Sequence, residues 1–367
     1  MENLAHTLLG LSLAKAGIER ATPLATTALV ISSNLPDVDV LMRFGDGTAD
    51  YLKYHRGFTH GFTGLAAMAV VLTLALTYLD RKFRLRRDHR RRPVRPLRIF
   101  WIAYLGGLGH IFMDFTNNYG VRPLSPFSNR WFYGDIAFVV DPWIWLILGS
   151  AVVWLTTTDS TRALFWLVVG IILALIVALA LRNPSESLVA IPTMARVIWF
   201  VGFAVILLGA LLGWGRAGEK LARYSLLFLG LYYGGMWMAH QSAMRQAANA
   251  SPVEGVSAMA AWPTPANPVL WQSVANTDRF VYTRFVNLTE KQGLWRELAK
   301  PDPKFIEALR QSEEARKFLD FVRFPSATVE EREDGYTVTV RDTRFDLRLS
   351  AELDRDLGII STDVRWF

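Results

Sequence analysis

The feature that most constrains this 367-residue chain is a series of long apolar runs that contain no charged side chain. Residues 62–79 and 163–181 are each long enough to cross about 30 Å of hydrocarbon as a helix. The other runs of this kind are 99–109 with 111–113, 143–155, 197–215 and 224–239. All of them lie before about residue 245, and 51% of the chain is hydrophobic. This profile predicts a mainly α fold, a polytopic membrane bundle of six to eight helices, followed by a small soluble domain.

An arginine-rich segment at 81–98 sets the expected orientation of these helices. It lies between two apolar runs and holds ten of the forty lysines and arginines in the chain. The positive-inside rule places it in the cytoplasm, beside anionic lipid headgroups. Alternation of the helices then brings a second basic loop, 215–223, to the same side and puts the C-terminal part outside. Topology therefore explains the net charge of +7 better than a nucleic-acid partner does, since Phe83 is the one stacking aromatic in the segment.

The first sixty residues are expected to form two short helical segments. Residues 3–17 and 21–33 fall short of a full span and contain Thr or Ser, so they form a helical pair, re-entrant segments or segments buried in the bundle. Residues 1–17 also lack a basic leader and a small-residue cleavage site. We therefore expect the first segment to be a retained helix.

The composition changes after residue 250 and predicts a separate α+β domain. We expect a membrane-embedded metal-site domain at 1–245, a proline-rich linker at 246–268 and an extracytoplasmic domain at 269–367. One helix is expected at 303–318, opened by a proline. Alternating apolar residues predict strands at 269–274, 279–288, 327–331, 336–341 and 359–366, with a hairpin turn at 333–335.

Five of the six histidines fall on the outer side under this topology. They are His6, His55, His60, His110 and His240, whereas His89 lies in the basic cytoplasmic segment. His240 is the weakest of the five, because it ends the last apolar run and can extend to the interface. The clustering favours a metal site more than any single motif does.

His110 and Asp114 form the first candidate motif. Four residues apart on a helix, they share one face, so both can bind one ion or the carboxylate can orient the imidazole. The alternative is a hydrogen-bonded polar pair at a helix end. An ionisable residue at membrane depth is a functional candidate by default, which favours the metal interpretation.

The sequence HRGFTH at 55–60 forms the second motif. Its histidines flank Gly57, which suits a turn that bends both imidazoles toward one centre. The alternative is a polar loop in which Thr59 or His60 caps the following helix. Arg56 is either a structural interface charge or a ligand for a phosphate or carboxylate of the substrate.

Two carboxylate pairs complete the candidate set. Asp37 and Asp39 follow Pro36, and in an extended segment alternate residues face the same way, so both carboxylates can reach one site. An ordinary Asp-rich turn is the alternative. Asp135 and Asp141 pose the same choice, and Asp141 before a proline can simply begin the next helix.

The chain contains no cysteine, which excludes disulfides, thiolate zinc sites and a cysteine nucleophile. Imidazoles and carboxylates remain as ligands, and they suit one or two divalent ions, with Zn²⁺ favoured and Mn or Fe as alternatives. In a two-metal site a bridged water attacks a phosphoryl or carbonyl centre.

These motifs together resemble the YdjM-type, LexA-regulated membrane-bound metal-dependent hydrolases. The resemblance covers roughly residues 1–150 and, more loosely, 263–268. It implies a hydrolase of a bacterial or archaeal cytoplasmic (inner) membrane, somewhat similar to the helical bundles of zinc phospholipase C and nucleases. The metal ligands that it implies are His6, Asp37, Asp39, His55, His60, His110 and Asp114.

The leading hypothesis is a hydrolase that acts on an ester or phosphodiester, of lipid or small-molecule origin, at the outer membrane interface. A metal-activated water is the nucleophile, Arg56 neutralises developing negative charge, and Asp39 or Asp135 is the general base. The alternative is a non-enzymatic module, either a metal carrier or a scaffold with a structural metal. A carrier requires ionisable residues in mid-helix, and the uncharged runs argue against that. The sequence leaves the oligomeric state open.

Overall fold

The computed structural model describes residues 1–44, 48–180, 191–251, 253–290, 293–345 and 347–366. The chain forms two compact units that are interleaved in sequence. The first comprises Met1–Val38, Phe58–Met238 and Thr264–Pro268, and the second comprises Asp39–Gly57, Ala239–Pro263 and Val269–Phe367.

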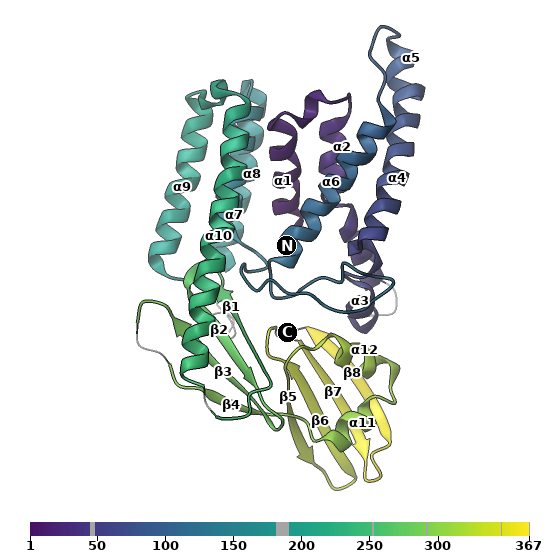
Figure 1. Ribbon diagram of the computed structural model, residues 1–367, viewed down its shortest axis with the longest axis vertical. Helices are drawn as coiled ribbons and strands as arrows, with labels where there is room; N and C mark the ends of the chain where they lie inside the picture. Colours follow the sequence, from purple (N-terminus) through teal and green to yellow (C-terminus); the bar gives the residue numbers. More distant parts are fainter. Residues whose placement is uncertain (45–47, 181–190, 252, 291–292, 346, 367) are drawn as a thin grey trace. The chain divides into compact units, whose positions relative to one another are not determined.

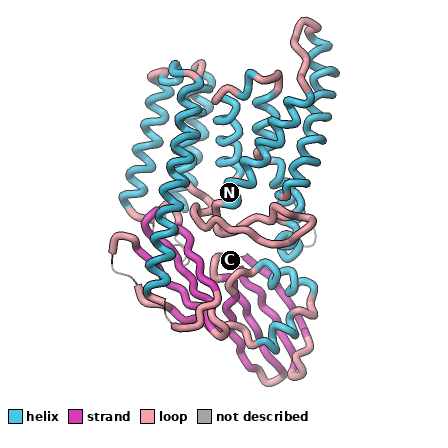
Figure 2. Tube along the Cα trace, in the orientation of Figure 1, coloured by secondary structure: helices cyan, strands magenta, loops and turns pink. Residues whose placement is uncertain are grey.

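The first unit is helical (Figure 1). Its α-helices are α1 (Asn3–Lys15), α2 (Ala25–Ser32), α4 (Phe62–Leu79), α5 (Leu85–Arg87), α6 (Pro96–Phe115), α7 (Pro142–Thr156), α8 (Ser160–Ala180), α9 (Thr193–Leu211) and the first part of α10 (Glu219–Asn249). The helices expected from the apolar runs are thus present, although residue 181 of the run at 163–181 lies outside the described residues. A long loop, seen in pink in Figure 2, joins α6 to α7.

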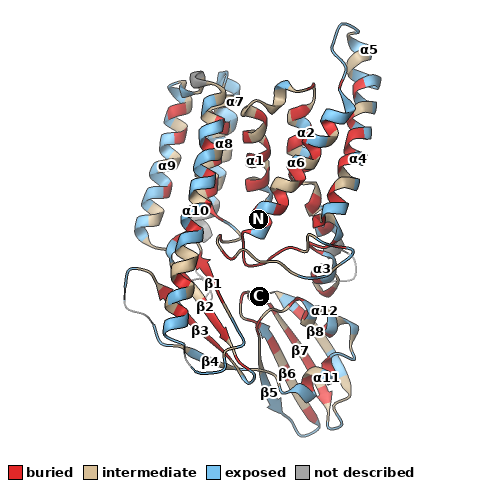
Figure 3. Cartoon of the chain, viewed as in Figure 1, coloured by how far each residue is buried: buried red, intermediate tan, exposed pale blue. Residues whose placement is uncertain are grey.

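Helix α6 is central to the packing of the first unit, because it contacts α1, α2 and α4. Small residues allow these helices to approach closely. A Cβ atom at Gly106 would lie 2.1 Å from Ser32 Oγ of α2, and one at Gly109 would lie 2.9 Å from Leu9 Cδ2 of α1. Helix α7 in turn packs against α1 and α9. The buried faces of these helices appear in red in Figure 3.

The outer faces of the helices carry exposed apolar side chains. Examples are Leu74 on α4, Ile172 on α8 and Leu211 on α9. Among the described residues, two helices, Phe62–Arg87 and Thr193–Leu211, are long and apolar enough to cross a membrane. Pro142–Thr156 and Ser160–Leu175 are shorter apolar helices. Exposed apolar surface of this kind is unfavourable in water and matches a hydrocarbon environment.

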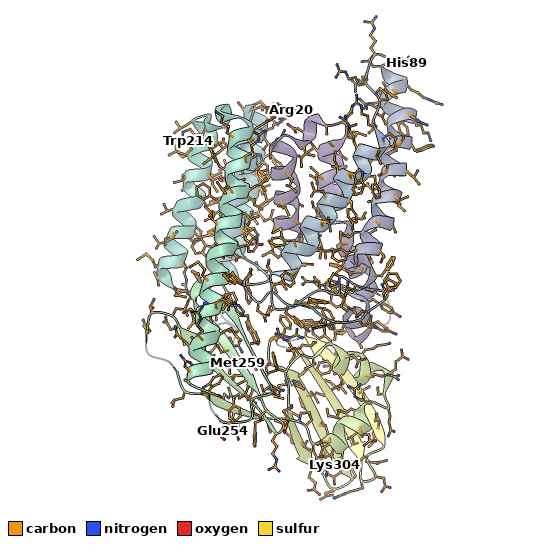
Figure 4. The ribbon with its side chains drawn as sticks, in the orientation of Figure 1. Arg20, His89, Trp214, Glu254, Met259 and Lys304 are labelled. Carbon is orange, nitrogen blue, oxygen red and sulfur yellow. The ribbon has the colours of Figure 1, made fainter. Side chains whose placement is uncertain are left out.

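The basic loops lie at one end of the first unit. Figure 4 shows Arg20, His89 and Trp214 at this end. Arg20 forms an ion pair with Glu219, and the Arg223 guanidinium donates to the carbonyl of Ala16 at 3.0 Å. Because α4 runs toward this end and α6 runs away from it, the beginning of α4 and the end of α6 meet at the opposite end. His60, just before α4, and His110 and Asp114, near the end of α6, lie there.

Gly64 gives a test of how tightly the beginning of α4 is packed. A Cβ atom there would lie 1.8 Å from the carbonyl oxygen of Phe58, a backbone atom that cannot rotate away. We expect Gly64→Ala to destabilise the protein by about 3 kcal/mol, the upper end of overpacking costs. Unfolding in mixed detergent micelles measures this change. Gly230→Ala in α10 is the matched control, because nothing lies within 4 Å of its Cβ position. Equal stability of the two variants would contradict the packing.

The second unit is rich in β-structure. Four antiparallel strands form a sheet in the order β1 (Ala258–Thr264), β2 (Asn267–Asn276), β3 (Phe280–Asn287) and β4 (Arg296–Ala299). A second sheet has the order β5 (Pro325–Glu331), β6 (Gly335–Asp342), β7 (Leu347–Asp354) and β8 (Ile359–Trp366). Strand β7 alternates strictly between buried and half-buried residues, as a sheet with one covered face requires.

Several expectations for the C-terminal part need correction. Strand β1 lies within the stretch expected as a linker, and the expected strands omit β1, β4 and β7. The single helix expected at 303–318 is two helices, α11 (Pro303–Leu309) and α12 (Glu313–Phe321). The chain breaks between them because the Ser312 side chain accepts from the backbone N–H of Ala315 and begins a new helix.

The second unit also contains a segment from the N-terminal half of the chain. Residues 39–57 belong to it and include the short helix α3 (Thr48–Tyr54). Helix α3 packs against α12 and β8 (Figure 1). Neither the helix nor this packing was expected from the sequence.

Candidate metal centre

Four donor groups converge in the first unit, from Asp37, His60, His110 and Asp114. The Nε2 atoms of His60 and His110 are 3.1 Å apart. Asp114 Oδ2 lies 3.3 Å from each of these nitrogens, and Asp37 Oδ1 lies 3.6 Å from each. The side chains of His60, His110 and Asp114 are fully buried, and that of Asp37 is 12% exposed. The cluster is therefore compact and is most accessible beside Asp37.

Local structure explains why these four residues meet. His110 and Asp114 occupy the last turns of α6 at i and i+4, which places them on one face. His60 ends the short 3₁₀ helix η3 (Phe58–His60), immediately before α4. Asp37 lies in η2 (Leu35–Phe44), which follows α2. Since α2, α4 and α6 pack together, their adjoining ends bring the donors to one point.

Hydrogen bonds on the far side of the imidazoles direct their lone pairs into the cluster. His110 Nδ1 lies 2.8 Å from the Ser33 carbonyl oxygen, which can only accept, so Nδ1 carries the hydrogen. In the neutral ring Nε2 then presents its lone pair. Thr59 Oγ1 lies 3.1 Å from His60 Nδ1 and is placed to accept in the same way. Orientation of a ligating histidine by a hydrogen bond from its other nitrogen is the usual arrangement at metal sites.

These distances fit a divalent metal ion. Ligand atoms about 2.0–2.1 Å from a tetrahedral Zn²⁺ lie about 3.3 Å from one another, close to the 3.1–3.6 Å separations here. Burial alone would raise the pKa of the Asp37 carboxyl, but a hydrogen bond from His60 and the positive charge that His110 and His60 carry when protonated lower that pKa overall. Asp37 is therefore an anion at neutral pH, as a ligand must be.

His6 lies beside the four donors and does not belong to their group. Its ring stacks on that of His110, with centroids 3.8 Å apart, and its Nε2 lies 3.5 Å from Asp114 Oδ1. This carboxylate oxygen, which the amino group of Met1 also contacts, is not the one that faces His60 and His110. The position of His6 suits a residue that orients Asp114 and His110.

Asp39 and His55 pair with each other in the second unit. Asp39 Oδ1 lies 2.8 Å from His55 Nδ1, and Oδ2 accepts the backbone N–H of Arg56 at 3.0 Å. The Tyr51 ring stacks on His55 with centroids 4.5 Å apart. The expectation of an extended segment at Asp37–Asp39 was wrong, because η2 is a 3₁₀ helix. The expectation that both carboxylates can reach one site nevertheless holds, because Asp37, Asp39 and His55 each offer a donor atom within 4.8 Å of the others.

Arg56 and Asp135 are both buried and both have a left-handed backbone conformation. Arg56 is 3% exposed with a positive φ of 56°, and Asp135 is 5% exposed with the same φ. Gly134 and Ile136, on either side of Asp135, donate to the carbonyls of Phe115 and Thr116, which fixes this loop to the end of α6.

Asp141 and His240 lie outside the four-donor group and contact other parts of the chain. Asp141 begins the next helix, which was the alternative to a role in the site. Its side chain caps α7 by accepting from the backbone N–H of Trp143 at 3.0 Å. It also accepts the Tyr232 hydroxyl at 2.7 Å. His240 lies beside Trp271 in the second unit, with ring centroids 5.8 Å apart. By contrast, neither Thr59 nor His60 caps α4, whose N-cap residue is Gly61.

The sequence did not indicate two groups that orient the candidate residues. The Ser33 carbonyl is a backbone group, and no residue type identifies it. Tyr51 stands four residues before His55, a spacing that would have indicated contact if helix α3 had been expected.

Comparisons with known proteins place these residues in a family. The family model described as YdjM inner membrane protein matches residues 1–185, half of the chain, and this range includes every candidate residue discussed above except His240. The looser resemblance at 263–268 lies outside the match. The uncharacterized protein YfhP of Bacillus subtilis (strain 168) is 25% identical over 222 residues, which cover 54% of this chain and 64% of the relative. The chain thus spans less than two thirds of the length of that relative. No solved structure matches this chain. With half of its length matched, the chain belongs to the YdjM inner membrane protein family.

Proposed function

We propose that the protein is a membrane-bound metal-dependent hydrolase of esters or phosphodiesters. The observation that carries this proposal is the convergence of two imidazole nitrogens and two carboxylate oxygens at separations of 3.1–3.6 Å. Such a group of acceptors is favourable when a cation lies among them. The motifs that resemble metal-dependent hydrolases supply the reaction class.

The donor set favours Zn²⁺, with Mn or Fe as alternatives. Imidazole and carboxylate ligands suit all three metals, and thiolate is absent because the chain has no cysteine. His60, His110, Asp37 and Asp114 would hold one ion. When bound, it supplies Lewis acidity and activates water at neutral pH. A second ion would require further ligands, for which Asp39 and His55 are the candidates.

The Asp39–His55 pair is suited to receive a proton. Asp39 accepts from His55 Nδ1, which leaves His55 Nε2 as the basic nitrogen of the neutral ring. Asp39 is separated from Asp37 by one residue, so their Cα atoms lie within about 7 Å. We therefore assign Asp39 an orienting role and His55 the role of proton acceptor or ligand. Arg56, and Asp135 beside the end of α6, remain candidates for binding the substrate.

The membrane setting suggests where the substrate comes from. We propose a multi-pass protein of the bacterial or archaeal cytoplasmic membrane, with six to eight helices and an extracytoplasmic C-terminal domain. The basic loops and the candidate metal centre lie at opposite ends of the helices of the first unit, which supports this orientation. The substrate would then be a lipid or a small molecule at the outer interface.

Metal affinity is expected to fall as the pH is lowered. The two imidazoles bind metal only as neutral rings, so protons compete with the ion. Asp37 contributes little to this competition, since its pKa is held low. We expect the affinity to fall by up to about tenfold per pH unit for each imidazole that must lose a proton. Isothermal titration with Zn²⁺ between pH 5 and pH 8 measures this dependence, and a flat profile would contradict ligation by histidine.

A structural metal site is the second candidate. Structural zinc sites are closed by four protein ligands, whereas catalytic sites keep one open position. The cluster offers four donors with three of the side chains fully buried, which favours the structural role. The 12% exposure of Asp37 favours catalysis, since this ligand lies where a substrate could displace it.

One experiment tests the hydrolase proposal and separates the two candidates. The full-length protein is purified in detergent and analysed for bound metal. It is then assayed against phospholipids and against chromogenic phosphodiesters and carboxylic esters. Bound metal with hydrolysis that a chelator abolishes and Zn²⁺ restores supports the proposal. Bound metal without hydrolysis of any of these substrates favours the structural site.

A further inference from the structure

The segment 39–57 connects the candidate metal centre to the C-terminal β-structure. It leaves the first unit after Val38 and returns to it at Phe58. The donor Asp37 thus lies two residues before the segment, and the donor His60 lies three residues after it. Between these ends the segment is part of the second unit, together with both β-sheets.

Charged side chains attach α3 of this segment to α12. Lys317 of α12 donates to Asp50 of α3 at 2.8 Å and to Glu313 at 2.9 Å. The Lys317 and Asp50 side chains are 13% and 16% exposed, whereas Glu313 is 66% exposed. The hydrogen bond to Asp50, and then the one to Glu313, raise the pKa of Lys317, so its charge persists at neutral pH. An ion pair this sheltered from solvent is screened less than a surface pair.

The same short helix orients the Asp39–His55 pair. Tyr51 follows Asp50 directly, and its ring stacks on that of His55. His55 contacts Asp39, and the backbone N–H of Arg56 donates to the same carboxylate. Helix α3 is therefore attached to α12 through Asp50, while the adjacent Tyr51 contacts the candidate proton acceptor His55.

We propose that the C-terminal domain positions the Asp39–His55 pair through α3, with Lys317 and Asp50 as positioning residues. This inference rests on the proposed function for its catalytic consequence and on the contacts above for its structural one. Tilting α12 against α3 displaces Tyr51 and with it the His55 ring. The domain thereby controls the geometry of the pair without contributing a ligand to the four-donor cluster.

Hydrogen exchange in the full-length, metal-free protein tests the structural consequence. We expect Lys317→Met to speed exchange of amides in 48–56 by about tenfold, because α3 loses its charged attachment. Lys317→Arg should stay within about threefold of wild type, since it keeps the charge. Arg310→Met is the matched control, because Arg310 forms an exposed ion pair with Asp320, 3.2 Å apart, and neither residue belongs to α3. It should leave exchange in 48–56 unchanged.

Two outcomes overturn the inference. They are unchanged exchange in Lys317→Met, and an equal increase in Arg310→Met. Lys317→Met could instead speed hydrogen exchange throughout β5–β8. In that case the double variant Asp50→Lys, Lys317→Asp, which swaps the two charges, distinguishes loss of the charged attachment from a general loss of stability. Protection of 48–56 restored in that variant supports the charged attachment, and failure to restore it overturns the attachment.

Kinetics and metal content distinguish this inference from the proposed function. We expect Lys317→Met to lower kcat by about tenfold with wild-type metal content and little change in KM, since it disturbs an orienting pair and not the four donors. Unchanged kcat in a protein with altered exchange overturns the catalytic part. A wild-type protein that binds metal without hydrolysis removes the proposed function, while the exchange experiment still decides whether Lys317 positions α3.

Discussion

Purified protein with both His110 and Asp114 replaced by alanine is expected to lose its bound metal. The double variant removes one imidazole and one carboxylate from a four-donor group, and it leaves His60 Nε2 and Asp37 Oδ1, which are 3.6 Å apart. Loss of a partner that merely orients a ligand weakens metal binding about 10–100-fold. Loss of two ligands should therefore weaken it by well over 100-fold, and chelator-sensitive hydrolysis should disappear with it.

A matched control for this experiment exists in the basic loop. Asp88 and His89 are the same two residue types, and neither belongs to the four-donor group. Figure 4 shows His89 at the end of the first unit where the basic loops lie. Alanine at both positions should leave metal content and activity at wild-type levels. Wild-type metal content in the His110, Asp114 variant would remove the assignment of the site, and equal loss in both variants would indicate a general effect on folding.

The helices of the first unit could be predicted from the sequence because their physical signal is local. An uncharged run such as 62–79 is compatible with few structures other than an apolar helix, and α4 spans these residues. His110 and Asp114 could be paired for the same reason, since the i, i+4 spacing fixes a common face. Which helix ends meet depends on packing, and Gly106 and Gly109 revealed close approach only once their neighbours were known.

The segment between the two donors could not be predicted because its structure depends on distant residues. Helix α3 has only seven residues, too few to be stable alone, and it packs against α12 more than 250 residues later in the chain. The 3₁₀ conformation of η2 likewise has no distinct sequence pattern, so the segment that holds Asp37 and Asp39 was expected to be extended. Strand β7 differs from these cases, because the alternation of its residues is visible in the sequence and is a local signal for a strand.

Replacement of Asp39 with asparagine is expected to reverse the tautomer of His55. The backbone N–H of Arg56 needs an acceptor, so the amide oxygen of the new side chain should take the place of Oδ2. Its NH₂ group then faces His55 Nδ1, where the carboxylate Oδ1 stands 2.8 Å away in the native protein. An NH₂ group can only donate, so Nδ1 must become the acceptor and the ring hydrogen moves to Nε2. His55 would thereby lose the basic nitrogen that either proposed role requires.

This change should lower kcat by about 100-fold or more, as the loss of an orienting carboxylate does in comparable imidazole–carboxylate pairs. Histidine-selective ¹⁵N spectra report the tautomer directly, with His55→Gln used to assign the signal. Asp363→Asn on β8, at an exposed ion pair with Arg365, is the control and should change neither the spectrum nor kcat. A reversed tautomer with full activity would exclude His55 from the chemistry. An unchanged tautomer would mean that the amide nitrogen faces Arg56 instead, and the hydrogen-bond assignment at Asp39 would then be wrong.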